Sequence, residues 1–175
     1  MKKIILLLAV VGMFSLQGCV GPEGPPGQDG FDGQDGLIGV VYENTSSNYY
    51  NFTNSNNFKV RFNFPNKLYD SDVVLVYRLG GVDGGKAIWE FLPQTYYQAN
   101  DARDFSFNFN FTYSYVDIYL SGTNLITVSN VFRLNQIFRI VVVPAGFAST
   151  LNKNNYNEVI SALNIKENKI QKINF

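Results

Sequence analysis

Alternating hydrophobic and polar positions are the strongest pattern in the chain. Phenylalanine fills every second position from Phe105 to Phe111, with Ser106, Asn108 and Asn110 between. Because successive side chains of a strand point to opposite faces, the pattern predicts a strand with all four rings in the core. The same alternation runs from Phe58 to Phe64 and predicts a second half-buried strand that ends at Pro65.

Further hydrophobic segments predict further strands. An unbroken apolar run indicates a central strand over residues 73–79, and Pro144 ends another at 136–143. Since residues 105–120 exceed one ordinary strand, we place a hairpin or bulge near Tyr113 and Ser114. The remaining strands are expected at 86–92, 116–120 and 170–175.

One segment has helical spacing. Tyr156, Val159, Ile160 and Leu163 recur at intervals of three and four residues, and Asn155 with Glu158 three residues later resembles a capping box. An asparagine-rich stretch over 44–57 is typical of a loop. Together the elements predict a mainly β fold, an antiparallel β-sandwich that is immunoglobulin-like in general architecture and has one short C-terminal helix.

The chain begins with a different pattern. Lys2 and Lys3 precede an apolar run from Ile4 to Leu16, which as a helix would span only about 20 Å of a roughly 30 Å hydrocarbon core. The run is therefore predicted to be the signal peptide of an exported protein, residues 1–18, and not a membrane span.

Cys19 is the predicted lipidation site. It follows Leu16, Gln17 and Gly18, an apolar residue and a small residue in the spacing of a bacterial lipobox, although Gln17 departs from the usual small residue. By this resemblance the thiol carries a diacylglyceryl group and the freed amine a further acyl chain. Each buried methylene contributes about 0.8 kcal/mol, so three chains would anchor the protein stably in a bilayer. The alternative is a free cysteine at an ordinary secretory cleavage site.

Six Gly-X-Y triplets fill residues 21–38, and Gly39 follows. Glycine at every third position is what a collagen triple helix requires, because only hydrogen fits at its axis. Only the first two triplets are rich in proline, and Asp29, Asp32 and Asp35 would repel one another in a trimer. We therefore interpret residues 19–39 as the lipidated cysteine and a monomeric spacer, with a homotrimer as the alternative.

This layout resembles flavobacterial (Bacteroidota) collagen-like lipoproteins. The resemblance rests on residues 16–19, the triplets of 21–39, and the segments 73–79, 138–145 and 156–165. It implies an outer-membrane, lipid-anchored protein, on either the periplasmic or the outer face. It implies no biochemical activity.

Composition and charge narrow the classes of function. Lys and Arg total 14, as do Asp and Glu, and this balance argues against nucleic acid as a partner. About 135 residues remain after the signal and stalk, which suits one domain at 40–175. The chain has no histidine, and lipidation would leave no free thiol, so the usual general base and cysteine nucleophile are missing.

Carboxylates are the remaining candidates for catalysis or metal binding. Glu90, Asp101 and Asp104 could supply an acid/base pair, but their spacing fixes no separation. Another candidate set for calcium comprises Asp70, Asp72 and Asp83, for which turn and cap roles are the simpler explanation. We predict neither a metal nor a cofactor.

Residues 80–86 match the spacing of a phosphate-binding loop, but Ala87 stands where that loop needs a hydroxyl and a strand follows where it needs a helix. A hairpin loop is therefore predicted there.

Aromatic side chains suggest glycan stacking, and the candidates are Tyr49, Tyr50, Tyr96, Tyr97 and Trp89. One ring of each adjacent tyrosine pair must point outward if the segments are strands. The leading hypothesis is a non-catalytic envelope module, either an accessory subunit of an outer-membrane complex or an adhesin-like binder. A carboxylate-dependent glycan hydrolase or a glycan-binding protein is the alternative.

Overall fold

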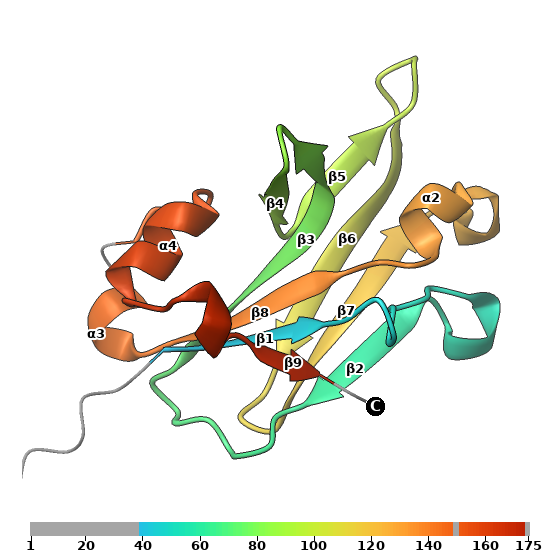
Figure 1. Ribbon diagram of the computed structural model, residues 1–175. Coiled ribbons are helices and arrows are strands. Elements are labelled where there is room, and N and C mark those ends of the chain that lie inside the picture. Colours follow the sequence, from blue (N-terminus) through green and yellow to red (C-terminus); the bar gives the residue numbers. More distant parts are fainter. Residues whose placement is uncertain (1–38, 149–150, 174–175) are drawn as a thin grey trace, which may run out of the picture. The chain divides into compact units, whose positions relative to one another are not determined.

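A computed structural model describes residues 39–148 and 151–173. The predicted signal peptide, Cys19 and the stalk up to Ile38 lie outside the described residues. In the described part of the chain about 45% is strand and 17% is helix, so the predicted mainly β class is confirmed. The strands form two sheets (Figure 1).

The larger sheet has five strands in the order β4-β3-β8-β1-β9. Their bounds are β1 Val40–Asn44, β3 Val73–Asp83, β4 Lys86–Phe91, β8 Phe138–Val143 and β9 Gln171–Ile173. The smaller sheet has four strands in the order β2-β7-β6-β5. Their bounds are β2 Lys59–Asn63, β5 Gln94–Tyr97, β6 Arg103–Phe111 and β7 Tyr115–Gly122.

β8 is the central strand of the larger sheet because it is hydrophobic on both faces. All six of its residues are buried. It pairs antiparallel with β3 on one side and with β1 on the other. A run such as Ile140 to Val143 suits this position, since its β-branched side chains pack against layers on both sides.

The main core lies between the two sheets. It combines Val76 and Ile140 of the larger sheet with Phe107 and Ile118 of the smaller one. Phe52, from the asparagine-rich segment, is fully buried in it and meets the rings of Phe107 and Phe138 at 5.6 and 5.9 Å. The segment expected to be a loop therefore supplies core aromatics.

A second core covers the opposite face of the larger sheet. Tyr77 and Val141 pack there against Val159 of helix α4 (Tyr156–Ala162) and against Leu163 at its C-terminal cap. The predicted capping box is confirmed in part. The Asn155 side chain accepts a hydrogen bond from the backbone N–H of Glu158, but the Asn155 backbone N–H donates to the Asn152 carbonyl and not to the Glu158 side chain. Two sheets and this helical layer thus form three layers.

Short helical segments connect the strands. These are η2 Asn54–Asn56, η3 Leu125–Thr127, α2 Asn130–Arg133, α3 Ala145–Ala148 and η4 Glu167–Lys169. None of them was predicted, because segments of three or four residues are too short to show a helical period. No helix within the described part of the chain has the length and apolar character needed to cross a membrane.

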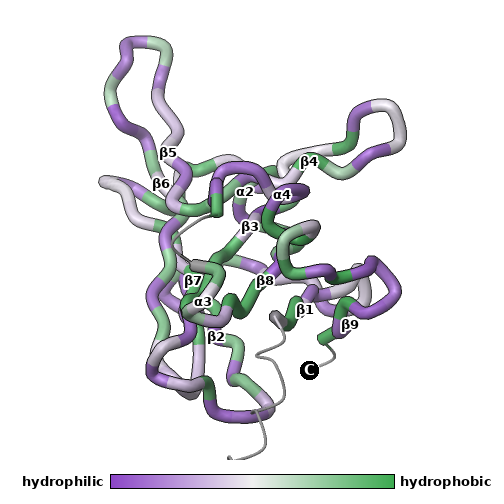
Figure 2. Tube along the Cα trace, turned by 90° about the vertical axis from the view of Figure 1, so that its left-hand side faces the viewer, coloured by the Kyte–Doolittle hydropathy of each residue, from purple (hydrophilic) through white to green (hydrophobic). Residues whose placement is uncertain are grey.

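Both expected hairpins are confirmed. β6 ends at Phe111 and β7 begins at Tyr115, and the Thr112 hydroxyl accepts backbone hydrogen bonds from Ser114 and Tyr115 in the turn. In the glycine-rich loop, Gly84 and Gly85 have φ of 53° and 78°, values that glycine adopts without strain. The β5–β6 hairpin is long, and its tip is largely hydrophilic (Figure 2).

Three expectations need correction. The sandwich is not wholly antiparallel, since β9 pairs parallel with β1 after crossing over through the α4 layer. Only the first rings of the phenylalanine strand are core: Phe105 and Phe107 are buried, whereas Phe111, at the end of β6 beside the turn, is 41% exposed. β5 was not expected, because its four residues, two polar residues followed by two tyrosines, are too few to alternate clearly.

Candidate functional site

The most unusual buried group in the domain is Arg78 near the middle of β3. The residue is 5% exposed, and its guanidinium lies 5.1 Å from the ring centroid of Phe107 and 5.4 Å from that of Phe132. A buried charge is costly unless it is paired. The side chains around Arg78 must therefore include partners for its charge.

Arg78 is held by three polar side chains. Its Nε donates to Gln136 Oε1 at 2.8 Å, and its Nη1 donates to Glu90 Oε2 at 3.0 Å and to the Tyr96 hydroxyl at 3.2 Å. The Tyr96 hydroxyl in turn donates to Glu90 Oε2 at 3.1 Å. Burial raises the pKa of Tyr96 to about 12; Arg78 opposes this effect and Glu90 adds to it. Tyr96 therefore acts as a neutral donor and acceptor at ordinary pH.

Gly80 makes room for this ion pair. A Cβ at that position would lie 2.5 Å from the carboxyl carbon of Glu90. The register of β3 and β4 also shifts between Leu79 and Gly81, which marks a β-bulge. The glycines that matched a phosphate-loop spacing thus serve two local purposes: Gly80 admits the Glu90 carboxylate, and Gly84 and Gly85 form the hairpin turn.

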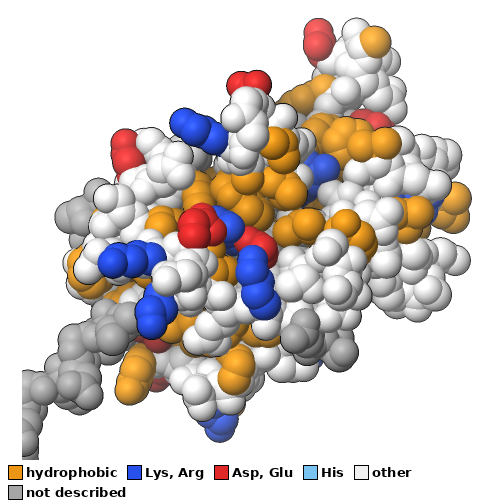
Figure 3. Space-filling view, viewed as in Figure 1, with side chains coloured by type: hydrophobic (Ala, Val, Ile, Leu, Met, Phe, Trp, Pro, Cys, Tyr) orange, Lys and Arg blue, Asp and Glu red, His pale blue; other side chains and the backbone are white. Residues whose placement is uncertain are grey.

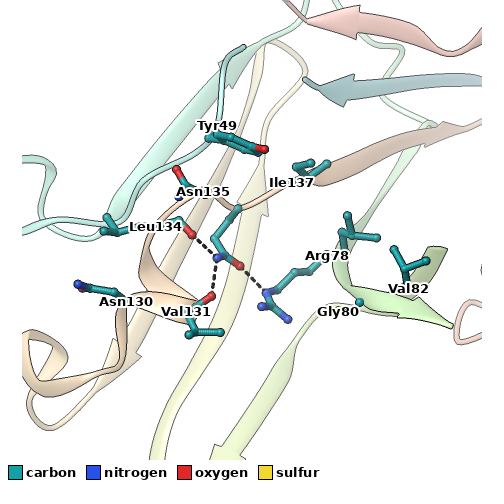
Figure 4. A pocket seen from close by; sticks show the side chains of 12 residues that line it. Tyr49, Arg78, Gly80, Val82, Asn130, Val131, Leu134, Asn135 and Ile137 are labelled. Carbon is teal, nitrogen blue, oxygen red and sulfur yellow. Dashed lines mark hydrogen bonds between the residues drawn. The ribbon is translucent and has the colours of Figure 1, made fainter. Parts of the chain in front are cut away.

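Arg78 lies at the wall of an open pocket of about 610 Å³ (Figure 4). Three segments line the pocket: Tyr49, the end of β3 from Arg78 to Val82, and residues 130–137 with part of α2. Gln136 holds these segments together, because its Nε2 donates to the carbonyl oxygens of Val131 and Leu134 while its Oε1 receives Arg78. The pocket wall is thus fixed by hydrogen bonds before any ligand arrives.

The rim of the pocket is hydrophobic and exposed. Val131 is 72% exposed, Val82 66% and Tyr49 38%. These side chains come from three separate segments and surround the same opening (Figure 4). An exposed apolar rim around a built pocket is typical of an interaction site.

The backbone of β3 is open on one side where it borders this pocket. β8 stays in register with β3 only from Val73 to Arg78, and one further hydrogen bond joins Leu79 N–H to the Ile137 carbonyl. From Gly81 to Asp83, β3 pairs with β4 alone among the strands that the structure describes. The end of β3 therefore presents a short free strand edge.

A second buried arginine, Arg139, ties the layers together. Its guanidinium bonds to Glu43 on β1 at 2.5 Å, to Glu167 of η4 at 2.7 and 2.8 Å, and to the Tyr156 hydroxyl. Lys172 also bonds to Glu43. Figure 3 shows acidic and basic side chains gathered in the middle of one face, beside a hydrophobic area over β3 and β4. This network is fully paired, which fits a structural role.

The aromatic candidates separate into two groups. Of each adjacent tyrosine pair one ring is outward, as predicted: Tyr49 and Tyr97 are exposed at 38% and 64%, whereas Tyr50 is buried and Tyr96 half-buried. Tyr96 stacks on Phe105 at 4.8 Å and so belongs to the core edge. Tyr49 lies in the segment between β1 and β2, whereas Tyr97 ends β5, and of these two rings only Tyr49 lines the Arg78 pocket.

Trp89 lies elsewhere, on β4 beside α4. Its indole is 4.3 Å from the Arg139 guanidinium and 5.6 Å from the Tyr156 ring. It lines a separate open groove of about 390 Å³ together with asparagines of residues 152–157. The five aromatic candidates therefore do not form one platform.

The carboxylate candidates are not brought into one site. Glu90 is occupied by Arg78, and Asp101 lies in the β5–β6 hairpin with φ of 62°. Asp104 accepts a 3.5 Å hydrogen bond from Gln98 and borders a different pocket with Arg103 and Gly122. Among the hydrogen bonds and ion pairs of the described residues, none joins two of these three groups to a shared partner.

The calcium candidates occupy turns. Asp72 Oδ2 accepts a hydrogen bond from Tyr69 N–H at 3.0 Å, in the turn before β3, while Asp83 begins the β3–β4 hairpin turn and Asp70 is exposed. Over residues 39–148 and 151–173, no three acidic, histidine or cysteine side chains are grouped as metal ligands.

The sequence did not reveal the Arg78 pocket. Arg78 stands inside an apolar run and therefore looked like part of a strand, and Gln136 looked like the start of another. A single arginine within an unbroken hydrophobic strand was the one usable signal, because such a residue must find partners when the strand is buried.

Comparisons with protein-family models, with curated proteins and with solved structures give no match. Function must therefore be inferred from the chain's own residues.

Proposed function

We propose that this chain is a lipid-anchored, non-catalytic module of the cell envelope that binds a partner polypeptide at the Arg78 pocket. On this proposal, Cys19 holds the protein in the outer membrane and the Gly-X-Y segment spaces the domain from it. The domain is taken as immunoglobulin-like in general architecture, with α4 as an added layer. The observation that carries the proposal is the free edge of β3 beside an exposed apolar rim.

An extended polypeptide fits this chemistry. A strand that adds to a sheet edge gains main-chain hydrogen bonds, and its alternate side chains enter neighbouring pockets. Gly81 leaves the β3 backbone uncovered, because a Cβ at this position would meet nothing within 4 Å. Tyr49, Val82 and Val131 then supply apolar contacts around the added segment.

Arg78 supplies a specific donor. Its Nη2 forms no hydrogen bond among the described residues, whereas Nε and Nη1 are both occupied. Because Glu90 already balances the charge of Arg78, a neutral acceptor such as a main-chain carbonyl suits this donor better than a second carboxylate.

The structure does not bring Glu90, Asp101 and Asp104 into one site, so the hydrolase alternative has no candidate acid/base pair. We therefore do not propose it. A subunit of an envelope complex is the form of the proposal that a strand edge favours, because such edges join chains directly.

Photo-crosslinking in membranes tests the proposal. A photoreactive residue is placed at Val82 or Val131 in the full-length protein, and at Tyr69 as the control. Tyr69 is 69% exposed and precedes β3, so the strand from Val73 to Arg78, about 17 Å long, lies between it and the pocket. We expect positions 82 and 131 to crosslink to the same protein and position 69 not to do so.

A second experiment combines the substitution Val131→Asp with a photoreactive residue at position 82. The substitution lies at an exposed site and should leave folding intact, yet it should reduce the crosslink at least tenfold. The proposal fails if positions 82 and 131 give no product while the protein migrates alone in mild detergent.

A further inference from the structure

A second surface of the domain, which shares no lining residue with the Arg78 pocket, has the composition of a sugar-binding site. It is the groove of about 390 Å³ between β4 and the segment that leads into α4. Its lining residues are Ala87, Ile88, Trp89, Asn152, Asn154, Asn155, Tyr156 and Asn157. One indole and four side-chain amides thus meet in a groove whose lining side chains carry no formal charge.

The indole is held in place from behind. The guanidinium of Arg139 lies 4.3 Å from its ring, and the ring of Tyr156 lies 5.6 Å away. Arg139 is itself fixed by Glu43 and Glu167. Trp89 is half-buried and contacts the second core, so its orientation is set before binding. A rigid aromatic surface loses little conformational entropy when a ligand stacks on it.

The asparagine segment is fixed as well. The Tyr77 hydroxyl donates to the Lys153 carbonyl at 2.7 Å, and Asn155 N–H donates to the Asn152 carbonyl at 3.0 Å. The side-chain oxygens of Asn152 and Asn155 accept local backbone hydrogen bonds. Their amide NH₂ groups make no hydrogen bond within the part of the chain that the structure describes, so they are left as donors.

Asn154 and Asn157 add two side-chain amides whose donors and acceptors are both left for a ligand. Both are exposed, and neither side chain takes part in a hydrogen bond among the described residues. Each amide offers two donors and an acceptor, the combination that vicinal hydroxyl groups require. An apolar platform beside several amides matches the two faces of a pyranose ring, one formed by C–H groups and the other by hydroxyls.

We propose that this groove, defined by Trp89, Asn154 and Asn157, binds a neutral saccharide. The lining side chains carry no formal charge, and the Arg139 cation behind Trp89 is already paired with Glu43 and Glu167. Acidic sugars, which would need a cationic partner, are therefore disfavoured. The site does not depend on the polypeptide partner proposed above, since it uses β4 and the α4 segment and none of the rim residues of the Arg78 pocket.

Trp89 is the only tryptophan in the sequence, so its fluorescence reports on this groove alone. The full-length protein in detergent is titrated with neutral oligosaccharides: cellohexaose, chitohexaose, xylohexaose, galactohexaose and maltohexaose. Oligogalacturonate serves as the acidic control. We expect at least one neutral probe to shift the emission with saturation and the acidic probe to leave it unchanged.

The double variant Asn154→Ala/Asn157→Ala keeps the reporter and removes two amides. It should weaken binding at least tenfold without lowering the thermal midpoint. Asn66→Ala, an exposed asparagine in the turn after β2, is the matched control and should bind as the unaltered protein does. Val131→Asp should also bind unchanged, which separates this site from the polypeptide site.

Two results overturn the inference. One is that no neutral probe in the panel changes the Trp89 emission at millimolar concentration. The other is that the double asparagine variant binds with unaltered affinity.

Discussion

At the scale of single residues, two glycines that look alike in sequence have different environments. A Cβ added at Gly80 would overlap the Glu90 carboxylate at 2.5 Å, whereas a Cβ at Gly81 would meet nothing within 4 Å. Neither has the positive φ that only glycine tolerates well, so sterics alone separate them. Gly80 is therefore tied to the Arg78 ion pair and Gly81 is not.

Gly80→Ala should displace Glu90 and separate it from Arg78 and Tyr96. Glu90 is partly exposed, so we expect a loss of about 1–2 kcal/mol in the free energy of unfolding, below the 3–5 kcal/mol of a fully buried pair. Gly81→Ala is the matched control and should be neutral or slightly stabilising. Urea unfolding measures both, and equal midpoints for the two variants would show that Gly80 is not holding the pair.

The same residues show where sequence interpretation ends. The turn at Gly84 and Gly85 was predictable from local chemistry, as was the Asn155 cap. The role of Gly80 was not, because it depends on Glu90 across the β3–β4 pair and on Gln136, which is 58 residues from Arg78. Patterns along the chain reveal which face a side chain occupies, but not which side chains meet on it.

At the scale of elements, Glu43 joins β1 to β8 and β9 through Arg139 and Lys172. Burial alone would raise the pKa of Glu43, but hydrogen bonds and charge from Lys172 and Arg139 outweigh it and hold the pKa below its ordinary value of 4.5. The unfolded chain therefore takes up this proton before the folded one does. The ionised Glu43 carboxylate therefore contributes its full stabilisation above pH 4.5, and this stabilisation is lost as the pH falls through the lower pKa of the folded state.

Glu43→Gln should make the protein less stable at neutral pH and reduce the dependence of unfolding on pH between about 6 and about 3. Glu158→Gln, at an exposed site on α4, is the control. Urea midpoints over this range provide the measurement. An unaltered slope in Glu43→Gln would mean that other carboxylates, such as Asp117 beside Arg61, dominate acid unfolding.

The hydrophobic pattern predicted strands correctly where both faces of the strand are buried. Val73 to Leu79 and residues 136–143 became neighbouring central strands because both are apolar on two faces. The parallel β9 was not foreseen, since its direction depends on α4 crossing the sheet. β5 was missed because Gln94–Tyr97 gains its place from pairing with β6 and not from its own hydrophobicity.

For the molecule as a whole, the predicted anchor is the lipidated Cys19. Mass spectrometry of the mature protein should find Cys19 at the N-terminus carrying a diacylglyceryl thioether and an amide-linked acyl chain. Cys19→Ala should release the protein from the membrane fraction, because two acylations are what make binding stable. Cleavage at another residue, or an unmodified thiol, would reject the lipoprotein interpretation.

The Gly-X-Y stalk is predicted to be a monomeric spacer. Asp29, Asp32 and Asp35 would place nine carboxylates close together in a triple helix, and only two triplets carry proline to stiffen the chains. A soluble form that begins at Gly21 should therefore sediment as a monomer, both in calcium and in chelator. Calcium matters because it could neutralise the aspartates and permit assembly. A trimer in either buffer would contradict the spacer interpretation, and a trimer in calcium alone would assign the three aspartates to an ion.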